Sequence, residues 1–518
     1  MLKPVHNILI ISITLIFSYG LLTKGIVILE NKLAIGSIFL VFLSLITVNK
    51  YKIPIKVLYK EDSSHPLYNF NEEVIDKALA SFRNINFKPL FPFIPLIIVT
   101  ILILIKPHYL FPTAGDLDYH LLRAREIIEN PFHGLFYDYL INYPIGRPVG
   151  HPPLFHTILA ALWYIGGVRF ADAVMSIAQI ILSMGIAIWF ANEKYGFIAG
   201  FFAGLLVLAA PRPDNLGVIM PATYIPIIAV LVIYFMPKNS KAAAIATIVG
   251  LWTHMISIVI FPLLFLFNKD GRSYLRNWKI GLPIIFSLVF WIGYWIYFTG
   301  QPGPLNAFNP SITTYYWTNL AGIIVLLSFG IPGIIILYKE KRAEFNLFIV
   351  YFITVMSLQV LIGDISRGFQ YAAVPLAILS GLSIQRIYTY ISHNYQKKFT
   401  ALFMIVLFFP IILGASNFLI SSINVPYSWN QTNIPFENKY CALGEHIKTS
   451  TNKNDVIWAD NSISYKIAWI NGRAMSNKGL EYPNNPSNTH QNVNIYIHSD
   501  FFLIEYKNNT GEKQVPFY

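Results

Sequence analysis

Stretches of apolar residues long enough to cross a lipid bilayer recur along most of this chain. A transmembrane helix needs about 20 consecutive, mostly apolar residues. The chain is 55% hydrophobic and only 12% charged, whereas soluble domains carry about 25% charged residues to cover their surface. The apolar segments fall at 8–23, 33–48, 89–105, 153–167, 170–190, 196–210, 216–236, 242–267, 280–298, 318–337, 345–362, 371–387 and 399–420. They predict an all-α polytopic membrane protein.

Lysine and arginine gather in particular loops, and short loops of this kind face the cytoplasm in most membrane proteins. The richest is the segment 49–88, and others lie at 238–241, 269–279, 339–342 and 393–398. We therefore expect a multi-pass protein of the cell membrane with a cytoplasmic N-terminus and an extracytoplasmic C-terminal tail. These loops explain the formal net charge of +12, so we expect membrane lipid and no nucleic acid as a partner.

Two apolar segments decide the number of spans. The segment 153–167 is short and follows Pro152, so we expect an interfacial helix there and not a span. The segment 242–267 joins two basic loops, which leaves two interpretations: two short helices that break near His254, or one span beside a miscounted neighbour. The favoured total is about 13 transmembrane helices.

Three regions follow from this pattern. Residues 1–88 are expected to hold two transmembrane helices and a basic cytoplasmic loop. Residues 89–420 are expected to form the main transmembrane domain, with a long external loop at 106–152. Residues 421–518 are expected to form a soluble domain outside the cytoplasm.

The tail at 421–518 differs in composition from the rest of the chain. It carries eight basic and eight acidic residues, a balance typical of the non-cytoplasmic side. Short runs at Val456–Ala459, Asn494–Ile497 and Phe501–Ile504 are typical of strands. A segment of about 100 residues can form a small core of its own, so we expect a small α/β domain.

Acidic residues stand at the predicted external edges of the membrane domain. Asp116 and Asp118 lie two positions apart in the external loop, and Asp214 lies at another edge. Carboxylate oxygens suit Mg²⁺ and Mn²⁺, and a metal there would neutralise a phosphate leaving group. Each Asp is equally suited to cap a neighbouring helix, which after Asp116 is expected at Leu117–Asn130, so both interpretations stay open.

Two arginines are further candidates. Arg147 lies in a loop rich in glycine and proline, where it would contact a phosphate or extend to the membrane surface. Arg367 lies between two spans, where its charge needs a partner, either Asp364 or a lipid phosphate. The external region also contains His108, His120, His133, His151 and His156. No two of them have the i, i+4 spacing of a helical metal site, which argues against a histidine-bound metal.

These motifs resemble those of the oligosaccharyltransferase catalytic subunit and, more broadly, of the GT-C class of membrane glycosyltransferases. The stretch Tyr143–Gly150 matches the family's Tyr-Pro-x-Gly-Arg-Pro-Val-Gly motif nearly intact. Asp214–Gly217 is similar to its external Asp-Asn-Glu-Gly motif, and Arg367 is similar to its late arginine. The family's first external motif is matched at Asp116, Tyr119, His120 and Leu121, and not at Leu117 and Asp118. The resemblance covers most of 89–420.

The resemblance implies a GT-C-like fold and a polyprenyl-phosphate-linked sugar as the donor. It also implies a divalent metal, Mn²⁺ or Mg²⁺. Asp116 would bind this metal or act as the general base, and Asp118 and Asp214 would assist it. Arg367, with Arg147, would hold the lipid phosphate.

The acceptor half of the family pattern is weaker. Leu216 stands where the family has Glu, and the stretch Ser311–Thr314 offers no Glu either. Where the family has a Trp-Trp-Asp-Tyr-Gly signature for its acceptor peptide, the tail offers only Trp458 and Asp460.

The leading hypothesis is therefore a glycosyltransferase that acts on an extracytoplasmic acceptor other than an Asn-x-Ser/Thr peptide. The alternatives are a divergent oligosaccharyltransferase, a non-catalytic protein that binds or helps assemble lipid-linked glycan, and a transporter. The long external loop argues against a transporter, because transporter sites usually lie at the midplane on broken helices.

Overall fold

The computed structural model describes most of the helical part of the chain and the strands of its tail. The described residues are 90–105, 117–140, 146–209, 220–299, 320–362, 365–395, 400, 403–408, 411, 443, 446–447, 449, 456–459, 475–477, 491–497, 501–506 and 512–516. Residues 1–88, with the first two predicted spans, lie outside them, as do Asp116, Asp214 and Asp460.

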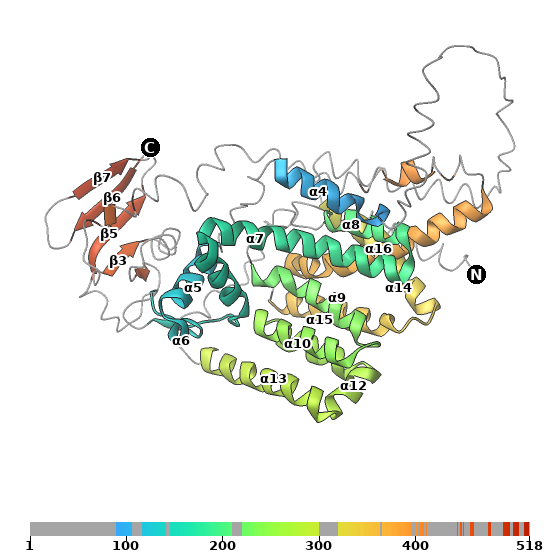
Figure 1. Cartoon of the computed structure of the whole chain (residues 1–518), viewed down its shortest axis with the longest axis horizontal. Coiled ribbons are helices and arrows are strands. Elements are labelled where there is room, and N and C mark those ends of the chain that lie inside the picture. Colours follow the sequence, from blue (N-terminus) through green and yellow to red (C-terminus); the bar gives the residue numbers. More distant parts are fainter. Residues whose placement is uncertain are drawn as a thin grey trace, which may run out of the picture.

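The main body consists of helices, which run side by side from α4 and α7 at one edge to α13 at the other (Figure 1). Its helical elements are η1 (Phe91–Phe93), α4 (Ile94–Ile105), α5 (Leu117–Glu129), α6 (Pro131–Gly134), α7 (Leu154–Tyr195), α8 (Phe197–Val207), η4 (Pro221–Tyr224), α9 (Ile225–Phe235), α10 (Ser240–Thr253), α11 (Ser257–Leu266), α12 (Lys269–Arg276), α13 (Trp278–Thr299), α14 (Leu320–Lys339), α15 (Glu344–Ile362) and α16 (Ile365–Asn394). The strands β1 (Tyr137–Asp138) and β2 (Arg147–Pro148) form a short antiparallel pair.

Among the described residues, three helices are long and apolar enough to cross a membrane: Phe170–Tyr195, Trp278–Tyr297 and Gly322–Lys339. Shorter apolar helices such as α8, α9 and α10 accompany them. The fold is therefore that of a largely helical membrane protein, as the apolar segments predict. The total of about 13 spans stays a prediction, as does the orientation.

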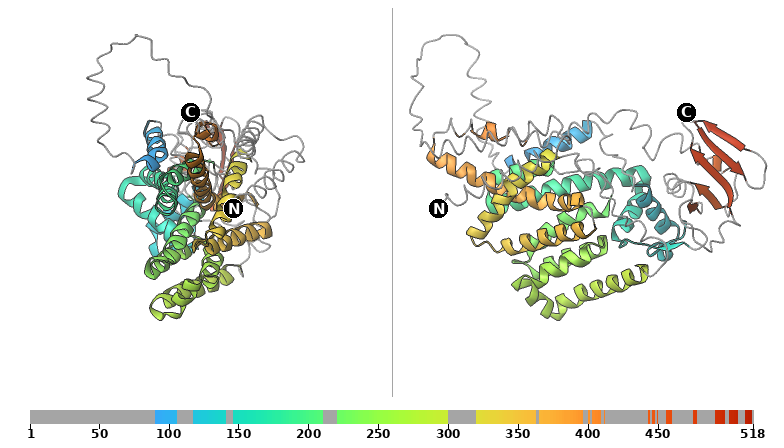
Figure 2. Two further views of the ribbon diagram at one scale, coloured as in Figure 1. Left: turned by 90° about the vertical axis from the view of Figure 1, so that its right-hand side faces the viewer. Right: turned by 180° about the vertical axis from the view of Figure 1, so that it is seen from behind.

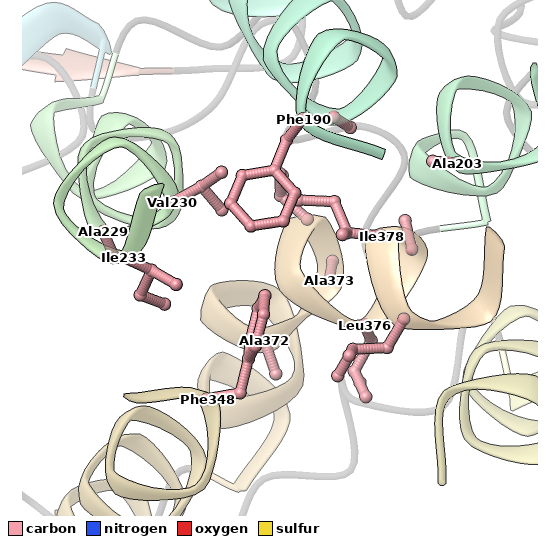
Figure 3. Close-up of a cluster of buried hydrophobic side chains, with 14 of the residues drawn as sticks. Phe190, Ala203, Ala229, Val230, Ile233, Phe348, Ala372, Ala373, Leu376 and Ile378 are labelled. Atoms are coloured by element: carbon pink, nitrogen blue, oxygen red, sulfur yellow. The ribbon is translucent and has the colours of Figure 1, made fainter. Parts of the chain in front are cut away.

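The core lies where α16 packs between the other long helices. Figure 3 shows the ring of Phe190, from α7, reaching between Val230 of α9 and Ile378 of α16. All three side chains are buried, and Phe348 of α15 lies in the same cluster. Because lipid tails are as apolar as these side chains, close packing and not exclusion from water must hold such helices together.

Two glycines allow α16 to contact its neighbours closely. A Cβ atom at Gly333 of α14 would lie 2.2 Å from the carbonyl oxygen of Leu379. A Cβ atom at Gly381 of α16 would lie 2.3 Å from the carbonyl oxygen of Ala199 on α8. Small residues at such positions let helix backbones approach each other inside a membrane.

The two predicted segments 153–167 and 170–190 are joined in one element, α7. The helix is interrupted at Gly167, whose φ of 83° is in the left-handed region. Glycine adopts this conformation without the steric cost that a side chain brings. The kink separates the apolar helix Leu154–Val168 from the candidate span Phe170–Tyr195. The predicted boundary between the segments 153–167 and 170–190 is therefore confirmed.

The segment 242–267 forms two helices, which decides between the two interpretations left by the sequence. α10 ends at Thr253 and α11 begins at Ser257. Between them, His254 is extended, with φ −154° and ψ 142°, and its Nδ1 accepts a hydrogen bond of 3.2 Å from the backbone N–H of Ile256.

The tail contains a five-stranded sheet in the order β4-β3-β5-β6-β7. Its strands are β3 (Val456–Ala459), β4 (Met475–Asn477), β5 (Gln491–Ile497), β6 (Phe501–Tyr506) and β7 (Glu512–Pro516). β3 pairs in parallel with β4 and β5, and the remaining pairs are antiparallel. The three predicted strands are confirmed. The sheet lies at the end of the body where α5 and α6 are found (Figures 1 and 2).

Candidate functional site

The helix predicted after the external acidic motif is present as α5, which begins at Leu117 and ends at Glu129. Asp118 lies in its first turn and is 8% exposed. His120, two positions later, is also buried. The first turn of α5 therefore places a carboxylate and an imidazole inside the protein at the end of the helical body.

A buried charge cluster holds α5 against the loop that follows it. The guanidinium of Arg123 is 1% exposed and donates to Glu126 and to the carbonyl oxygen of Gly134. Its Nη1 lies 2.7 Å from Oδ1 of Asp138 on β1 and 3.2 Å from the carbonyl oxygen of Tyr137. A charge this deeply buried is tolerated only when its hydrogen bonds and charge are matched in this way.

The second carboxylate of the cluster also bonds to the backbone. Oε1 of Glu126 accepts a hydrogen bond of 2.9 Å from the backbone N–H of Leu140. Burial raises the pKa of Glu126 to about 8, although Arg123 lowers it. At neutral pH, Glu126 is then mostly protonated.

In the described part of the Tyr-Pro-x-Gly-Arg-Pro motif, the glycine has a structural role. β1 and β2 pair so that Asp138 faces Arg147 along the backbone. Gly146, directly before β2, has φ 67°, and a Cβ atom there would lie 2.5 Å from Cε1 of Tyr137. Only glycine fits this turn, and the turn fixes where the backbone of Arg147 lies.

Four histidines gather beside the first turn of α5. Nδ1 of His120 lies 2.9 Å from Nε2 of His156 at the start of α7. The ring of His151 is 6.1 Å from that of His120 and 5.4 Å from that of His254, between centroids. Tyr119 adds a ring 6.0 Å from His151. The cluster thus joins α5, the start of α7 and the break between α10 and α11.

The electrostatics of this cluster favour neutral imidazoles. Burial, and next the nearby His151, lower the pKa of His120. Burial, and next the nearby His120, lower the pKa of His156. Within the described part of the chain, no group of three or more His, Cys, Asp or Glu side chains has the arrangement of a metal site.

The structure shows on which elements the described site residues lie, while their roles stay predictions. It places Asp118 in the first turn of α5 and Arg147 in β2, at the same end of the body. Arg367 lies near the start of α16, and Trp458 lies in β3, where its backbone is in register with Ser476 and Asn494. Whether Asp116 and Asp214 approach each other falls outside the described residues.

Sequence reasoning missed four of the residues that build this site: Arg123, Glu126, Asp138 and His254. The first three belong to the external loop. The spacing of Arg123 and Glu126, three positions apart on one helix, indicates that their side chains can pair. His254 interrupts an otherwise apolar segment, which was a signal that it faces something polar.

Comparison with solved structures identifies the fold. The archaeal oligosaccharyltransferase AglB of Archaeoglobus fulgidus, in complex with an inhibitory peptide and a dolichol-phosphate, superposes with a TM-score of 0.51 at 11% identity. The alignment covers 71% of this chain and 61% of that one. The chain has a GT-C-type fold. The expectation from the external motifs is therefore confirmed at the level of the fold.

Sequence similarity to a known protein extends over part of the chain. Over 241 residues the GT-C-type chain is 26% identical to dolichyl-phosphooligosaccharide-protein glycotransferase 1 of A. fulgidus. This stretch covers 46% of the chain and only 34% of that relative. ArnT of Cupriavidus metallidurans bound to undecaprenyl phosphate aligns with a TM-score of 0.47 and 13% identity, over 76% of this chain and 86% of that one. No protein-family profile matches the chain.

Proposed function

We propose that this chain is a membrane glycosyltransferase that transfers a sugar from a polyprenyl-phosphate-linked donor to an extracytoplasmic acceptor. The observation that carries the proposal is the fixed position of the first turn of α5. Arg123 and Asp138 hold α5 on the loop, and the contact between His120 and His156 holds it on α7. A transferase benefits from such rigidity, because reacting groups must be kept in a narrow geometry.

The donor follows from the fold and from the similar protein. The solved A. fulgidus structure holds a dolichol-phosphate, a polyprenyl-type lipid phosphate. In this chain, Arg367 near the start of α16 and Arg147 in β2 would contact the phosphate. Guanidinium groups suit this role, because they donate two parallel hydrogen bonds to phosphate oxygens.

The acidic residues would serve the reacting end of the donor. Asp116 would bind a divalent metal, Mn²⁺ or Mg²⁺, or act as general base toward the acceptor hydroxyl. Asp118 and Asp214 would be further ligands. Asp118 is the described member of this set, and its carboxylate is a hard-oxygen donor of the right kind. When bound, the metal would stabilise the charge of the leaving phosphate.

Two other candidates share the donor and differ in the acceptor. Leu216 in place of Glu favours a non-catalytic protein that binds or helps assemble lipid-linked glycan. A divergent oligosaccharyltransferase would need Trp458 in β3 and Asp460 next to it to recognise the acceptor peptide.

The decisive experiment measures transfer by the purified full-length protein in liposomes. The substrate is a radiolabelled pool of native polyprenyl-phosphate sugars, supplied with Mn²⁺ or with EDTA. We expect metal-dependent transfer that is lost in Asp116→Ala and kept in Glu129→Gln, which changes an exposed acid at the other end of α5. Binding of the lipid without transfer, unchanged by EDTA, would establish the non-catalytic alternative instead.

A further inference from the structure

A cationic helix lies at the end of the body opposite to α5 and α6. This helix, α12, joins α11 to α13 (Figure 1). Lys269, Arg272 and Arg276 are all exposed. Their spacing of three, four and seven positions places them on one face of the helix.

The opposite face of α12 is fixed to the protein. The hydroxyl of Tyr274 donates a hydrogen bond of 2.8 Å to the carbonyl oxygen of Met236 at the end of α9. A Cβ atom at Gly271 would lie 2.5 Å from the carbonyl oxygen of Phe265, so α12 packs directly on the end of α11. Asn268 caps the helix by accepting from the N–H groups of Asp270 and Gly271. The cationic face therefore cannot turn inward.

The cations of α12 differ from two neighbouring basic residues at this end of the body that have acidic partners. There, Lys238 pairs with Glu193 and Arg386 pairs with Glu340. In the described part of the chain, no ion pair includes Lys269, Arg272, Arg276 or Lys279. Asp270 is the one acid on α12 itself. The face thus carries uncompensated positive charge.

An apolar stripe continues directly from this cationic face. α13 begins with Trp278, which is 69% exposed, and Leu282, Phe286 and Val289 follow on the same side with their side chains exposed. In the span Trp278–Tyr297, only 22% of the most apolar stretch is buried against protein. The ammonium of Lys279 lies 5.7 Å from the centre of the Trp278 ring. Tryptophan is enriched where the membrane surface begins.

We propose that the corner between α12 and α13 binds an acidic phospholipid. Its headgroup phosphate lies against Arg272, Arg276 and Lys279, and one acyl chain lies along the stripe that begins at Trp278. The charge of the helix face and the apolar stripe beside it together favour an acidic phospholipid. The positive charge favours anionic lipid headgroups, while the exposed apolar stripe excludes a partner that is soluble and wholly polar.

The geometry makes this a site and not only a basic surface. The cations stand on a helix whose other face is held by Tyr274 and Gly271, so they are arranged before the lipid arrives. Preorganised groups lose less conformational freedom on binding. Arg272 is additionally held by a hydrogen bond of 3.0 Å from its Nη1 to the carbonyl oxygen of Leu266.

The test uses the purified full-length protein in detergent micelles, titrated with phosphatidylglycerol or with phosphatidylcholine of the same chain length. Bound lipid is counted by native mass spectrometry. We expect the protein to retain phosphatidylglycerol in preference to phosphatidylcholine. In the variant Arg272→Gln, Arg276→Gln, Lys279→Gln, which removes the three cations assigned to the headgroup, we expect retention of phosphatidylglycerol to weaken by about tenfold or more. Glycerol phosphate without acyl chains should not compete.

A matched variant removes three exposed cations elsewhere at the same end: Lys339→Gln, Lys341→Gln, Arg342→Gln. It should weaken retention by less than about twofold, because those residues lie at the end of α14 and in the turn after it, not on α12 or α13. Equal loss in both variants, equal retention of the two lipids, or displacement by glycerol phosphate would each overturn the proposal. The melting temperature of each variant is measured alongside, and Arg272→Lys replaces the triple variant if the latter unfolds, with a smaller loss expected because lysine lacks the planar fork of arginine.

Discussion

Arg123 of α5 and Asp138 of β1 form a buried ion pair, with Nη1 and Oδ1 2.7 Å apart and neither side chain more than 1% exposed. The pair connects the helix to the strand that returns beneath it. Because both charges are withdrawn from water, the favourable interaction depends on both partners being present. This contact therefore helps to hold α5 against β1.

Removing one partner should be far more damaging than removing an exposed pair from the same helix. We expect Asp138→Ala to lower the free energy of unfolding by about 3–5 kcal/mol, because Arg123 is left buried without its charged partner. The control is Arg125→Ala, which breaks the pair between Arg125 and Glu129 with side chains 23% and 38% exposed and should cost less than about 1 kcal/mol. Chemical unfolding in detergent compares them, and equal losses would contradict a structural role of the buried pair.

Gly146 provides a second test of the loop. Gly146→Ala puts a side chain at φ 67° and 2.5 Å from the Tyr137 ring, so we expect a loss of about 2 kcal/mol or more. Gly293→Ala in α13 is the matched control, because no atom lies within 4 Å of the added Cβ atom. Inside a helix this change should be neutral or stabilise by up to about 1 kcal/mol. Thermal melting of the two variants in the same detergent would decide, and a stable Gly146→Ala would show that the loop adopts another conformation.

Much of the fold follows from local signals in the sequence. The apolar runs predict the helices, and a break near His254 between α10 and α11 is one of the two interpretations that the sequence allows. The helix predicted at Leu117–Asn130 is present and ends at Glu129. These features were predictable because each depends on neighbours within one or two helical turns.

The site was less predictable because its contacts join distant parts of the chain. His120 and His156 are 36 positions apart, and the ring of His254, from the break between α10 and α11, lies beside that of His151. The clustered histidines lack an i, i+4 spacing because they come from several different elements. The pairing of Arg123 with Asp138 likewise depends on the turn at Gly134, and no local sequence pattern predicts this turn.

The raised pKa of Glu126 predicts how stability depends on pH between about 5 and 8. Burial raises it from an ordinary value of 4.5 to about 8 in the folded protein. Between these values the folded state binds a proton that the unfolded state has released. Stability should therefore fall as the pH rises from about 5 to 8, by up to about 1.4 kcal/mol per pH unit from this group.

A substitution isolates this contribution. Glu126→Gln keeps the shape of the protonated side chain and removes the titration, so the decline of melting temperature over this interval should become shallower. Glu129→Gln, which changes an exposed acid on the same helix, should leave the decline in place. If the two variants and the wild type show the same slope, Glu126 is not protonated in the folded protein.

The histidine pair predicts the opposite trend on the acid side. Burial, and next the nearby His120, lower the pKa of His156 in the folded protein, while an unfolded histidine titrates near 6.5. Below that pH the unfolded state binds a proton that the folded state does not bind, so stability should fall as the pH drops below about 6.5.

The variant His156→Gln should lose part of this acid sensitivity. The dependence of its melting temperature on pH above 7 should stay unchanged. His133→Gln, which alters an exposed histidine of the same loop, is the control. Melting curves from pH 5 to 7.5 would contradict the buried neutral pair if His156→Gln and His133→Gln followed the wild type equally.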